Sequence, residues 1–479
     1  MKPPKVTKKL AVSNFKTRIT VVGTWILILG VVYGIYFAFN MFPVIAGYGA
    51  KSLCSCVYLQ GRNEQDVIKQ ELGTFMGKFG SFAVNPEDSS ASGKVLFFSN
   101  KKAIYRKGLG CTLVNGLEEG ELRSQQFTGK MNVAINQDTI AWPDGNLIAD
   151  SLPEGLNQVA LNKIVSDAFV EKNANAPLNT RALLVVYDGT IVAEKYSDGF
   201  NPSTPQMGWS MTKSIVNAMV GILVKQGKLK MDDPAPIPDW ANDDRKKITL
   251  NDLMHESSGL DWSEIYSRPS DAVEMLFRSK DAGLFAFSKK PADAPNEKFY
   301  YSSGTTNIIS WIIRNQLGDE NYHRFPYEKL FNKIGMHSAL IEPDPTGTFV
   351  GSSFSFATAR DWARFGLLYQ NDGVWNGERI LPEGWVKNTA TPAPAAPRGE
   401  YGAQWWLNAG EKGKPSNRLY PDVPTDAMIA DGFEGQYVFV IPSKKLVVVR
   451  LGLSQDASPD MNKLVADIIS VLSELEPQD

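Results

Sequence analysis

Histidine and cysteine are both scarce in this sequence, which contains three of each among 479 residues. All three cysteines lie within the first 111 residues, and the three histidines show no spacing typical of metal ligands. A structural or catalytic zinc site needs several such ligands at short spacing, so we expect no metal site. The residues concerned are Cys54, Cys56, Cys111, His255, His323 and His337.

The sequence also lacks an excess of basic residues, because 50 lysines and arginines stand against 52 aspartates and glutamates. A nucleic-acid-binding protein carries such an excess, so we expect no nucleic-acid partner. The patterns Gly-x-Ser-x-Gly, Gly-x-Gly-x-x-Gly, Gly-Lys-Ser/Thr and His-Glu-x-x-His are absent as well. These absences argue against an α/β-hydrolase, a nucleotide-binding enzyme and a zinc protease, and we expect no cofactor.

The N-terminus is both basic and strongly apolar. Residues 1–18 contain six basic residues and no acidic residue, and residues 19–42 carry no charge at all. At about 1.5 Å per residue, a helix over 19–42 covers the roughly 30 Å hydrocarbon core of a bilayer. The basic flank stays in the cytoplasm, so we predict a single-pass protein of the inner or plasma membrane. The remaining chain would then face the periplasm or the cell surface.

Two alternatives apply to this segment. It can be a cleaved signal peptide, with Ala46 and Ala50 as neighbours of the cleavage site. Residues 53–56 (Leu-Cys-Ser-Cys) faintly resemble a lipoprotein acceptor site, but they lie far beyond the apolar run. Disulfides persist outside the cytoplasm, so we expect Cys111 to pair with Cys54 or Cys56, leaving the third cysteine free or cross-linking two chains.

The chain divides into four predicted parts. They are a cytoplasmic basic tip (1–18), a transmembrane helix (19–42), a small extracytoplasmic module (43–150) and a large domain (151–479). Turn signals at 144–145 (Asp-Gly) and 153–155 (Pro-Glu-Gly) indicate the last boundary. The small module carries no interpretable motif, and nothing in the sequence predicts an oligomeric state.

The large domain is predicted to have an α/β (α+β) fold. Alternation typical of strands occurs near both of its ends, and the first pair is joined by the hairpin signal Asp188-Gly189. Apolar residues at helical spacing predict one helix that ends at Gly227 and another at the C-terminus. We therefore predict one antiparallel sheet built from both chain ends, flanked by helices, with a helical subdomain between. The predicted strands are 181–187, 190–196, 436–441 and 445–451, and the predicted helices are 210–226 and 459–474.

Ser210 and Lys213 are the first candidate catalytic pair. They open the apolar helix and share one face of it, so the amine can approach the hydroxyl. A serine becomes nucleophilic when a neighbouring base takes its proton, and a lysine can do so when burial keeps it uncharged. The pattern Ser-x-x-Lys also occurs at Ser13–Lys16 and Ser99–Lys102. On its own it is equally consistent with a serine helix cap beside a solvated lysine.

Two further segments support a catalytic site. Tyr301 precedes small polar residues and an apolar helix, where a phenol can shuttle a proton to a leaving group. Gly432 and Phe433 lie at the lip of a predicted strand, where a backbone N–H can hold an oxyanion. The alternatives are a core tyrosine beside a helix cap and an ordinary turn entering a strand.

Taken in this order, the three segments resemble the serine beta-lactamase and penicillin-binding-protein superfamily. The class C-like branch, with its esterases, D-amino-acid peptidases and 6-aminohexanoate-dimer hydrolases, is the most similar. The likeness covers roughly 160–475 and includes further segments read as framework: 253–260 (Leu-Met-His-Glu-Ser-Ser-Gly-Leu), 357–366 and 401–406. His255, within the first of these, has no acidic partner at recognisable spacing and is not expected to be catalytic.

The resemblance implies a role for each candidate residue. Ser210 would form an acyl-enzyme, Lys213 would be its base, and Tyr301 would protonate the leaving group. The N–H groups of Ser210 and of Gly432 or Phe433 would hold the oxyanion. Tyr266 resembles a substrate-contacting tyrosine of the nylon-oligomer hydrolases. The implied substrate is a small-molecule amide or ester.

Two departures from the family pattern narrow this expectation. Ser303 stands where class C beta-lactamases have asparagine, and the strand before Gly432 reads Met-Ile-Ala-Asp instead of Lys-Thr-Gly. The loss of that lysine and threonine argues against beta-lactam hydrolysis and leaves ester or amide hydrolysis. The competing hypothesis is a catalytically silent module of the same fold that binds peptides or peptidoglycan.

Overall fold

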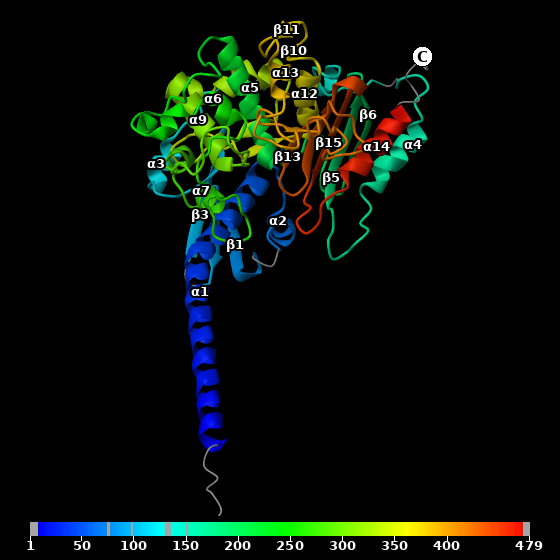
Figure 1. The fold of residues 1–479 in the computed structure, drawn as a ribbon. Helices are drawn as coiled ribbons and strands as arrows, with labels where there is room; N and C mark the ends of the chain where they lie inside the picture. The colour runs from blue at the N-terminus through cyan, green and yellow to red at the C-terminus, as the bar shows by residue number, and fades with distance from the viewer. Residues whose placement is uncertain (1–7, 74–76, 97–98, 130–135, 150–151, 473–479) are drawn as a thin grey trace, which may run out of the picture.

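The structure, a computed structural model, describes residues 8–73, 77–96, 99–129, 136–149 and 152–472. Its most prominent element is helix α1 (Lys8–Tyr58), which projects from the body of the molecule (Figure 1). Every residue from Ile19 to Tyr36 is exposed, whereas Met41 and most residues after it are buried. The helix is long and apolar enough to cross a membrane. Residues 1–7 of the predicted basic tip lie outside the described part.

The predicted boundary at residue 42 falls inside α1, because the helix continues into the folded body. There it packs against a small antiparallel sheet of order β1-β2-β3-β4. A Cβ at Gly93 would lie 2.2 Å from the carbonyl oxygen of Ala46, so glycine allows the strand to approach the helix this closely. The strands are β1 (Gly80–Asn85), β2 (Ser90–Val95), β3 (Ser99–Arg106) and β4 (Gly110–Leu113).

Two kinds of bond fasten α1 to the rest of the molecule. A disulfide joins Cys54 of α1 to Cys111 of β4, which confirms that Cys111 pairs with one of the other two cysteines. Cys56 is free and buried. The second bond is a buried ion pair between Lys51 and Glu342 of the large domain. The carboxylate of Glu342 also accepts hydrogen bonds from the Ser55 hydroxyl (2.9 Å) and the Cys111 N–H (2.6 Å).

The large domain is built on a six-stranded antiparallel sheet of order β12-β13-β14-β15-β5-β6. Its two halves come from opposite ends of the domain, as predicted, and β15 pairs with β5 to join them. Asp188 and Gly189 both adopt positive φ angles in the β5–β6 turn, the conformation that a two-residue hairpin requires. The strands are β5 (Thr180–Tyr187), β6 (Thr190–Tyr196), β12 (Trp406–Leu407), β13 (Met428–Gly432), β14 (Gln436–Ile441) and β15 (Leu446–Gly452).

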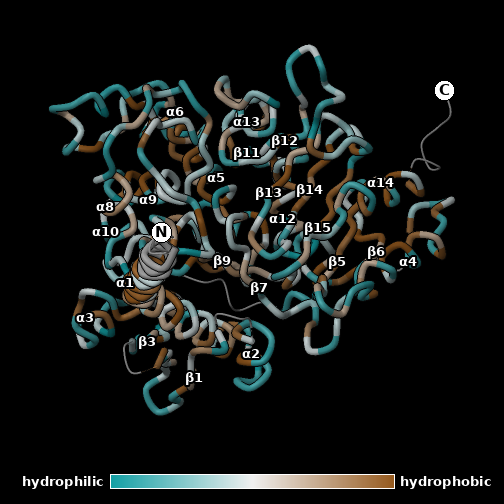
Figure 2. Tube along the Cα trace, turned by 60° about the horizontal axis from the view of Figure 1, so that its bottom comes forward, coloured by the Kyte–Doolittle hydropathy of each residue, from teal (hydrophilic) through white to brown (hydrophobic). Residues whose placement is uncertain are grey.

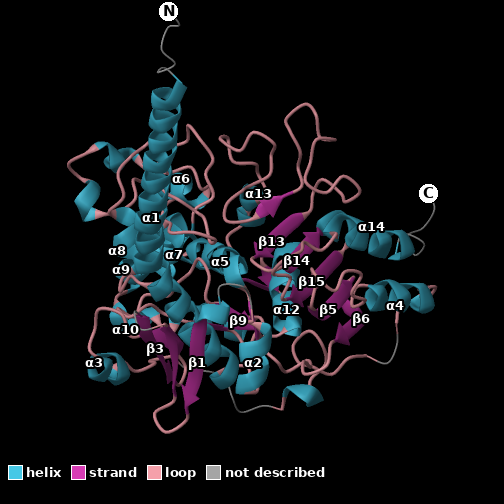
Figure 3. Ribbon diagram, turned by 90° about the horizontal axis from the view of Figure 1, so that it is seen from below, coloured by secondary structure: helices cyan, strands magenta, loops and turns pink. Residues whose placement is uncertain are grey.

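Helices cover both faces of this sheet (Figure 3). Leu183 and Val185 face the layer of α4 and α14, while Leu184 and Val186 face the core that contains α5 and α12. This alternation is the period of two expected for a strand buried on both sides. The covering helices are α4 (Gln158–Asp167), α5 (Thr212–Lys225), α12 (Ala359–Gln370) and α14 (Met461–Leu472).

Helices α6, α7, α8 and α10 pack around α9 and form the predicted helical subdomain beside α5. Figure 2, seen from below, shows α1 between this subdomain and the small sheet. Short strand pairs complete the fold: β7 (Gln206–Met207), β9 (Ser355–Ala357) and β8 (Leu340–Ile341) form one sheet, and β10 (Val374–Trp375) pairs with β11 (Glu378–Arg379). The other helices are α2 (Glu64–Gln70), α3 (Glu119–Ser124), α6 (Leu250–Met254), α7 (Asp271–Phe277), α8 (Ala282–Phe287), α9 (Ser303–Leu317), α10 (Asp319–Tyr322), α11 (Phe325–Lys329) and α13 (Trp385–Thr389).

The predicted fold class is confirmed, and the ends of the predicted strands and helices lie within two residues of the observed ones. At the predicted helix 210–226, α5 begins at Thr212 and a short 3-10 turn, Trp209–Met211, precedes it. The boundary predicted between residues 150 and 151 lies outside the described residues.

The Lys51–Glu342 pair gives a stability prediction. Glu342→Ala leaves the Lys51 ammonium buried without a partner, and breaking a buried pair in this way costs about 3–5 kcal/mol. We expect the free energy of unfolding of the full chain in detergent to fall by that amount in a denaturant titration.

Asp167→Ala is the matched control, since it breaks an exposed ion pair with Lys163 (2.6 Å). Exposed pairs contribute less than about 1 kcal/mol. Equal losses in the two variants would show that the buried pair does not hold α1 in place.

Candidate active site

Ser210 sits at the point where a strained turn enters α5. The preceding residue, Trp209, has a positive φ of 47°, which is unusual for a bulky residue and typical of strained functional turns. The turn is held on both sides: Gly208 donates its N–H to the Ser355 carbonyl (2.8 Å), and the Thr212 hydroxyl donates to the Trp209 carbonyl (2.6 Å). The Ser210 side chain is half-buried. A substrate can therefore reach it while the backbone around it stays fixed.

The Lys213 amine is buried one helical turn away, and three oxygens surround it. Its Nζ lies 3.1 Å from Ser210 Oγ, 3.2 Å from Ser303 Oγ and 3.1 Å from the Ser352 carbonyl oxygen. The carbonyl oxygen can only accept a hydrogen bond.

The orientation of the amine follows from the Ser303 hydroxyl. That hydroxyl donates its own hydrogen to Glu264 Oε1 (2.6 Å), so toward Lys213 it can act only as an acceptor. An uncharged amine has two hydrogens, and Ser303 and Ser352 take both. Its lone pair then points at Ser210 Oγ, which is the geometry that a base needs.

Opposing forces act on the charge of Lys213. Burial lowers its pKa, because a charged amine loses its hydration there, and the carboxylates of Glu264 and Glu256 raise the pKa. Burial also raises the pKa of Glu256. The site therefore contains an amine that gives up its proton more readily than a solvated lysine.

Tyr301 lies against the same amine, with its ring centroid 4.7 Å from Lys213 Nζ. Burial raises the pKa of its phenol well above the ordinary value, and a hydrogen bond with Ser210 acts in the opposite direction. The phenol thus stays protonated near neutral pH while touching the hydroxyl of Ser210. Its ring packs against Tyr401 and Trp406, which fix its position at the start of α9.

Glu264 is a member of the site that the sequence analysis missed. Four donors occupy its two carboxylate oxygens: the Ser303 hydroxyl and N–H (2.6 and 2.9 Å), the Trp262 indole (2.6 Å) and the Tyr266 hydroxyl (2.5 Å). The Tyr266 hydroxyl lies 3.4 Å from Ser303 Oγ. Ser303 thus lies between the predicted Tyr266 and Lys213. Glu264 accepts hydrogen bonds from both Tyr266 and Ser303 and so holds them side by side. In the sequence, Glu264 lies within the segment 261–266 (Asp-Trp-Ser-Glu-Ile-Tyr), where only Tyr266 was predicted to belong to the site.

Gly432 and Phe433 lie beside the turn that carries Ser210. A Cβ at Gly432 would come within 2.2 Å of the Gly208 carbonyl oxygen, so only glycine lets β13 run this close to the turn. The Phe433 ring contacts the rings of Trp209 (5.6 Å between centroids) and Tyr266 (5.3 Å). Both residues are thus near Ser210, and their role as oxyanion donors stays a prediction.

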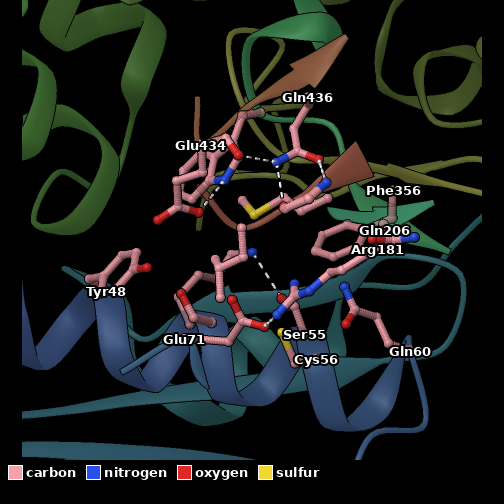
Figure 4. Close-up of a pocket in the computed structure, with 16 residues that line it drawn as sticks. Tyr48, Ser55, Cys56, Gln60, Glu71, Arg181, Gln206, Phe356, Glu434 and Gln436 are labelled. Atoms are coloured by element: carbon pink, nitrogen blue, oxygen red, sulfur yellow. Dashed lines mark hydrogen bonds and ion pairs between the residues drawn. The ribbon is translucent and has the colours of Figure 1, made fainter. Parts of the chain in front are cut away.

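A polar cavity beneath this turn connects it to the N-terminal module (Figure 4). Glu434 accepts hydrogen bonds from the Trp209 indole (3.3 Å) and the Gln455 amide (3.2 Å), and Gln455 also reaches the Glu71 carbonyl (3.2 Å). Glu71 forms a buried ion pair with Arg181 (2.6 Å). Trp209, the residue before Ser210, is therefore linked to the module that carries α1. Burial raises the pKa of Glu434 to about 7.

The structure brings Ser210, Lys213 and Tyr301 together through direct contacts, and Tyr266 is linked to Lys213 through Ser303, with Gly432 and Phe433 alongside. It separates the other candidates from this site. Lys102 of the second Ser-x-x-Lys pattern forms ion pairs with Asp88 and Glu119 on the small sheet. His255 ends α6. Across the described residues, no group of three or more histidine, cysteine, aspartate or glutamate side chains could hold a metal ion.

A family model described as Beta-lactamase matches residues 166–470, which is more than half of the chain. The chain belongs to the beta-lactamase family. Its 6-aminohexanoate-dimer hydrolase relative from Paenarthrobacter ureafaciens is 26% identical over 296 residues, covering 57% of this chain and 72% of that protein. The resemblance to the beta-lactamase superfamily is therefore confirmed. Family and relative together identify a serine hydrolase and weigh against a silent binding module.

Solved structures show the same fold. A putative 6-aminohexanoate-dimer hydrolase from Bacillus anthracis superposes with a TM-score of 0.54 at 24% identity, covering 66% of this chain and 82% of that one. A putative beta-lactamase from Bacteroides dorei gives a TM-score of 0.54 at 17% identity, covering 66% of this chain and 99% of that one. Residues before about 160 thus fall outside the family match.

The Lys213 environment gives a prediction on pH dependence. An amine accepts a proton only when uncharged, so we expect ester turnover to rise with pH as Lys213 deprotonates. Glu264→Gln removes a carboxylate that favours the charged amine, and a charge at this range changes a pKa by about 1 unit or more. The rise in kcat/KM should therefore move to lower pH by about 1 unit, with a lower plateau because Ser303 is no longer held.

The exposed Glu383→Gln is the matched control, and its pH profile should equal that of the parent. A parent profile that is flat between about pH 6 and 10, or a Glu264→Gln profile with the parent's midpoint, would exclude this account of Lys213.

Proposed function

We propose that this protein is a membrane-anchored serine hydrolase that cleaves ester or amide bonds through an acyl-enzyme on Ser210. The observation that carries the proposal is the convergence of a half-exposed hydroxyl, a buried amine and a protonated phenol at one turn. Their residue types and order resemble the motif set of serine beta-lactamases, and the chain belongs to the beta-lactamase family.

In the first step, Ser210 Oγ attacks the substrate carbonyl carbon and its proton passes to the lone pair of Lys213 Nζ. The carbonyl π electrons move to the oxygen, which becomes a tetrahedral oxyanion. Backbone N–H groups at the N-terminal end of α5 and at Gly432 or Phe433 would hold this charge. The ammonium formed on Lys213 is stabilised by the carboxylates of Glu264 and Glu256.

In the second step, the bond from carbon to the leaving oxygen or nitrogen breaks, and the leaving atom takes a proton from the Tyr301 phenol. Lys213 returns a proton to Tyr301, so the phenol regains its initial state. Water then attacks the acyl-enzyme with the same groups acting in reverse, which releases the carboxylic acid and restores Ser210. No step requires a cofactor.

The strand beside Ser210 favours an uncharged substrate. In class C beta-lactamases this strand carries Lys-Thr-Gly, whereas β13 offers Ala430 and Asp431 before Gly432. Asp431 is acidic and offers no positive charge to a substrate carboxylate, and burial raises its pKa to about 7. A neutral ester or amide therefore fits better than a beta-lactam.

The exposed half of α1 supports the membrane anchor. Residues 19–36 have no protein neighbour that buries them, and an apolar helix in this state is stable in a bilayer rather than in water. Residues 43–150 form the small module that joins this anchor to the catalytic domain. The basic N-terminus places the catalytic domain on the outer side.

Loss of the nucleophile is the direct test of the mechanism. Ser210→Ala removes the hydroxyl at an accessible position, so we expect the hydrolysis of 4-nitrophenyl acetate to fall to background while the thermal unfolding midpoint stays that of the parent. Ser203→Ala changes an exposed serine in a nearby turn and should leave turnover unchanged. Parent-like turnover in Ser210→Ala would refute the assignment.

The anchor is tested by fractionation and protease treatment. We expect the full chain to stay in the membrane fraction after alkaline carbonate extraction, with an intact N-terminus by mass spectrometry. Protease added outside the plasma membrane should digest the catalytic domain. A soluble chain cleaved near Ala46 or Ala50 would instead establish a signal peptide.

A further inference from the structure

A cavity of about 220 Å³ lies between α1 and the catalytic domain. One wall is a stripe on a single face of α1, with the spacing of successive helical turns. The opposite wall comes from residues around the turn of Ser210 and from α7. The stripe consists of Met41, Val44, Ile45 and Tyr48, and the opposite wall includes Trp209, Tyr266, Val273, Phe277 and Phe433.

The inner end of the cavity is lined by residues next to the candidate active site. Trp209 directly precedes the nucleophile, and Phe433 follows Gly432 on the segment beside it. The Tyr266 hydroxyl lies 3.4 Å from Ser303 Oγ, which in turn contacts Lys213. A ligand in the cavity would therefore have one end beside Ser210.

The α1 end of the cavity lies directly above the membrane anchor. Met41, the first of the stripe, is buried, and the fully exposed apolar stretch of α1 ends at Tyr36. At about 1.5 Å per residue, five residues separate these positions by about 8 Å along the helix. The cavity is thus at the depth of the lipid headgroups when residues 19–36 span the hydrocarbon core.

The lining restricts the chemistry of the ligand. Its walls are mainly aliphatic and aromatic, and the acidic side chains among the lining residues are Glu434 and Asp456. An apolar cavity of about 150 Å³ already binds benzene, so this larger one accommodates several methylene groups. An aliphatic chain fits these walls, whereas an anionic group would lose its hydration beside two acidic side chains.

The position of Tyr301 indicates which part of the substrate the cavity receives. Tyr301 is the proposed proton donor to the leaving group, and it packs against Tyr401 and Trp406. Neither these three residues nor Ser210 and Lys213 line the cavity, whereas Trp209 and Phe433, the chain neighbours of Ser210 and Gly432, do. We therefore assign the cavity to the acyl side of the bond that is cleaved.

We propose that this cavity binds the aliphatic acyl chain of an ester or amide that the enzyme draws from its own membrane. The proposal rests on the function proposed above and adds the substrate class. The N-terminal helix then has two roles, since it anchors the protein and completes the acyl-binding wall.

The first test compares the full chain in detergent on 4-nitrophenyl acetate, butyrate and octanoate. Each methylene that enters an apolar cavity raises kcat/KM by about fourfold, so the octanoate-to-acetate ratio should exceed tenfold. Val44→Trp fills the cavity from the α1 side and should lower this ratio at least tenfold. Val44→Ala, which enlarges the cavity, should move the preferred chain to a greater length.

Val159→Trp is the matched control, because Val159 of α4 is 82% exposed and distant from the cavity. Its ratio should equal that of the parent. Labelling of Ser210 by a fluorophosphonate shows that each variant retains its site. A variant that is not labelled is replaced by Val44→Ala, which the fold tolerates more easily.

The second test asks where the substrate comes from. The full chain is reconstituted into phosphatidylcholine vesicles, and 4-nitrophenyl palmitate is placed either in the same vesicles or in separate ones. If the enzyme draws its substrate from its own membrane, nitrophenol should be released at least tenfold faster when enzyme and substrate share the same vesicles. Equal rates would overturn this part of the proposal.

The outcomes distinguish failure of the acyl-chain proposal from failure of the proposed function. Ser210-dependent turnover of acetate with no chain-length preference, or with a preference that Val44→Trp leaves intact, overturns the acyl-chain proposal and keeps the proposed function. No Ser210-dependent turnover of any ester overturns the proposed function, and the acyl-chain proposal fails with it.

Discussion

The orientation of one buried amine is the constraint on which the candidate site depends. Lys213 is enclosed by the protein, so its charged form is costly, and the two carboxylates of Glu264 and Glu256 reduce that cost. Because Ser303 is committed as a donor to Glu264, it must accept from Lys213, and this commitment leaves the amine's lone pair for Ser210. In the proposed mechanism, a single hydrogen bond between Ser303 and Glu264 therefore sets the direction of proton transfer.

The rest of the molecule holds this arrangement in place and links it to the proposed membrane anchor. The strained turn at Trp209 is held by β9 on one side and by Glu434 on the other, and Glu434 is linked through Gln455 to the module that carries α1. The disulfide at Cys54 fastens that helix to β4 of the small sheet, and the buried pair at Lys51 fastens it to Glu342 of the large domain. The proposed anchor, the cavity and Ser210 are thus connected through one set of contacts.

The sequence predicted the elements whose signal is local. The Asp188-Gly189 hairpin, the apolar helix after Ser210 and the C-terminal strands each follow from the composition of a few adjacent residues, and their positions are confirmed. The segments around Ser210, Tyr301 and Gly432 indicated the family because all three occur in the order of the family's motifs. The membrane segment was visible for the same reason, as an uninterrupted apolar run.

What the sequence did not reveal depends on distant contacts. Glu264 lies in a turn-rich segment without a pattern, and its importance appears only where folding places it against Ser303. The continuation of α1 beyond residue 42 and its face toward the active site arise from packing against β2, α7 and the turn of Ser210. The stripe from Met41 to Tyr48 reads in the sequence as the end of a membrane helix, and only the structure shows that it forms the wall of a cavity.

The central claim is that a neutral Lys213 activates Ser210, and the rate of covalent labelling measures this directly. The full chain and Lys213→Met are incubated with a fluorophosphonate over a range of pH, and the modified peptide is identified by mass spectrometry. The account predicts one adduct, on Ser210, that forms faster as pH rises in the parent and slowly at every pH in Lys213→Met. An adduct on another residue, or equal rates in the two proteins, would contradict it.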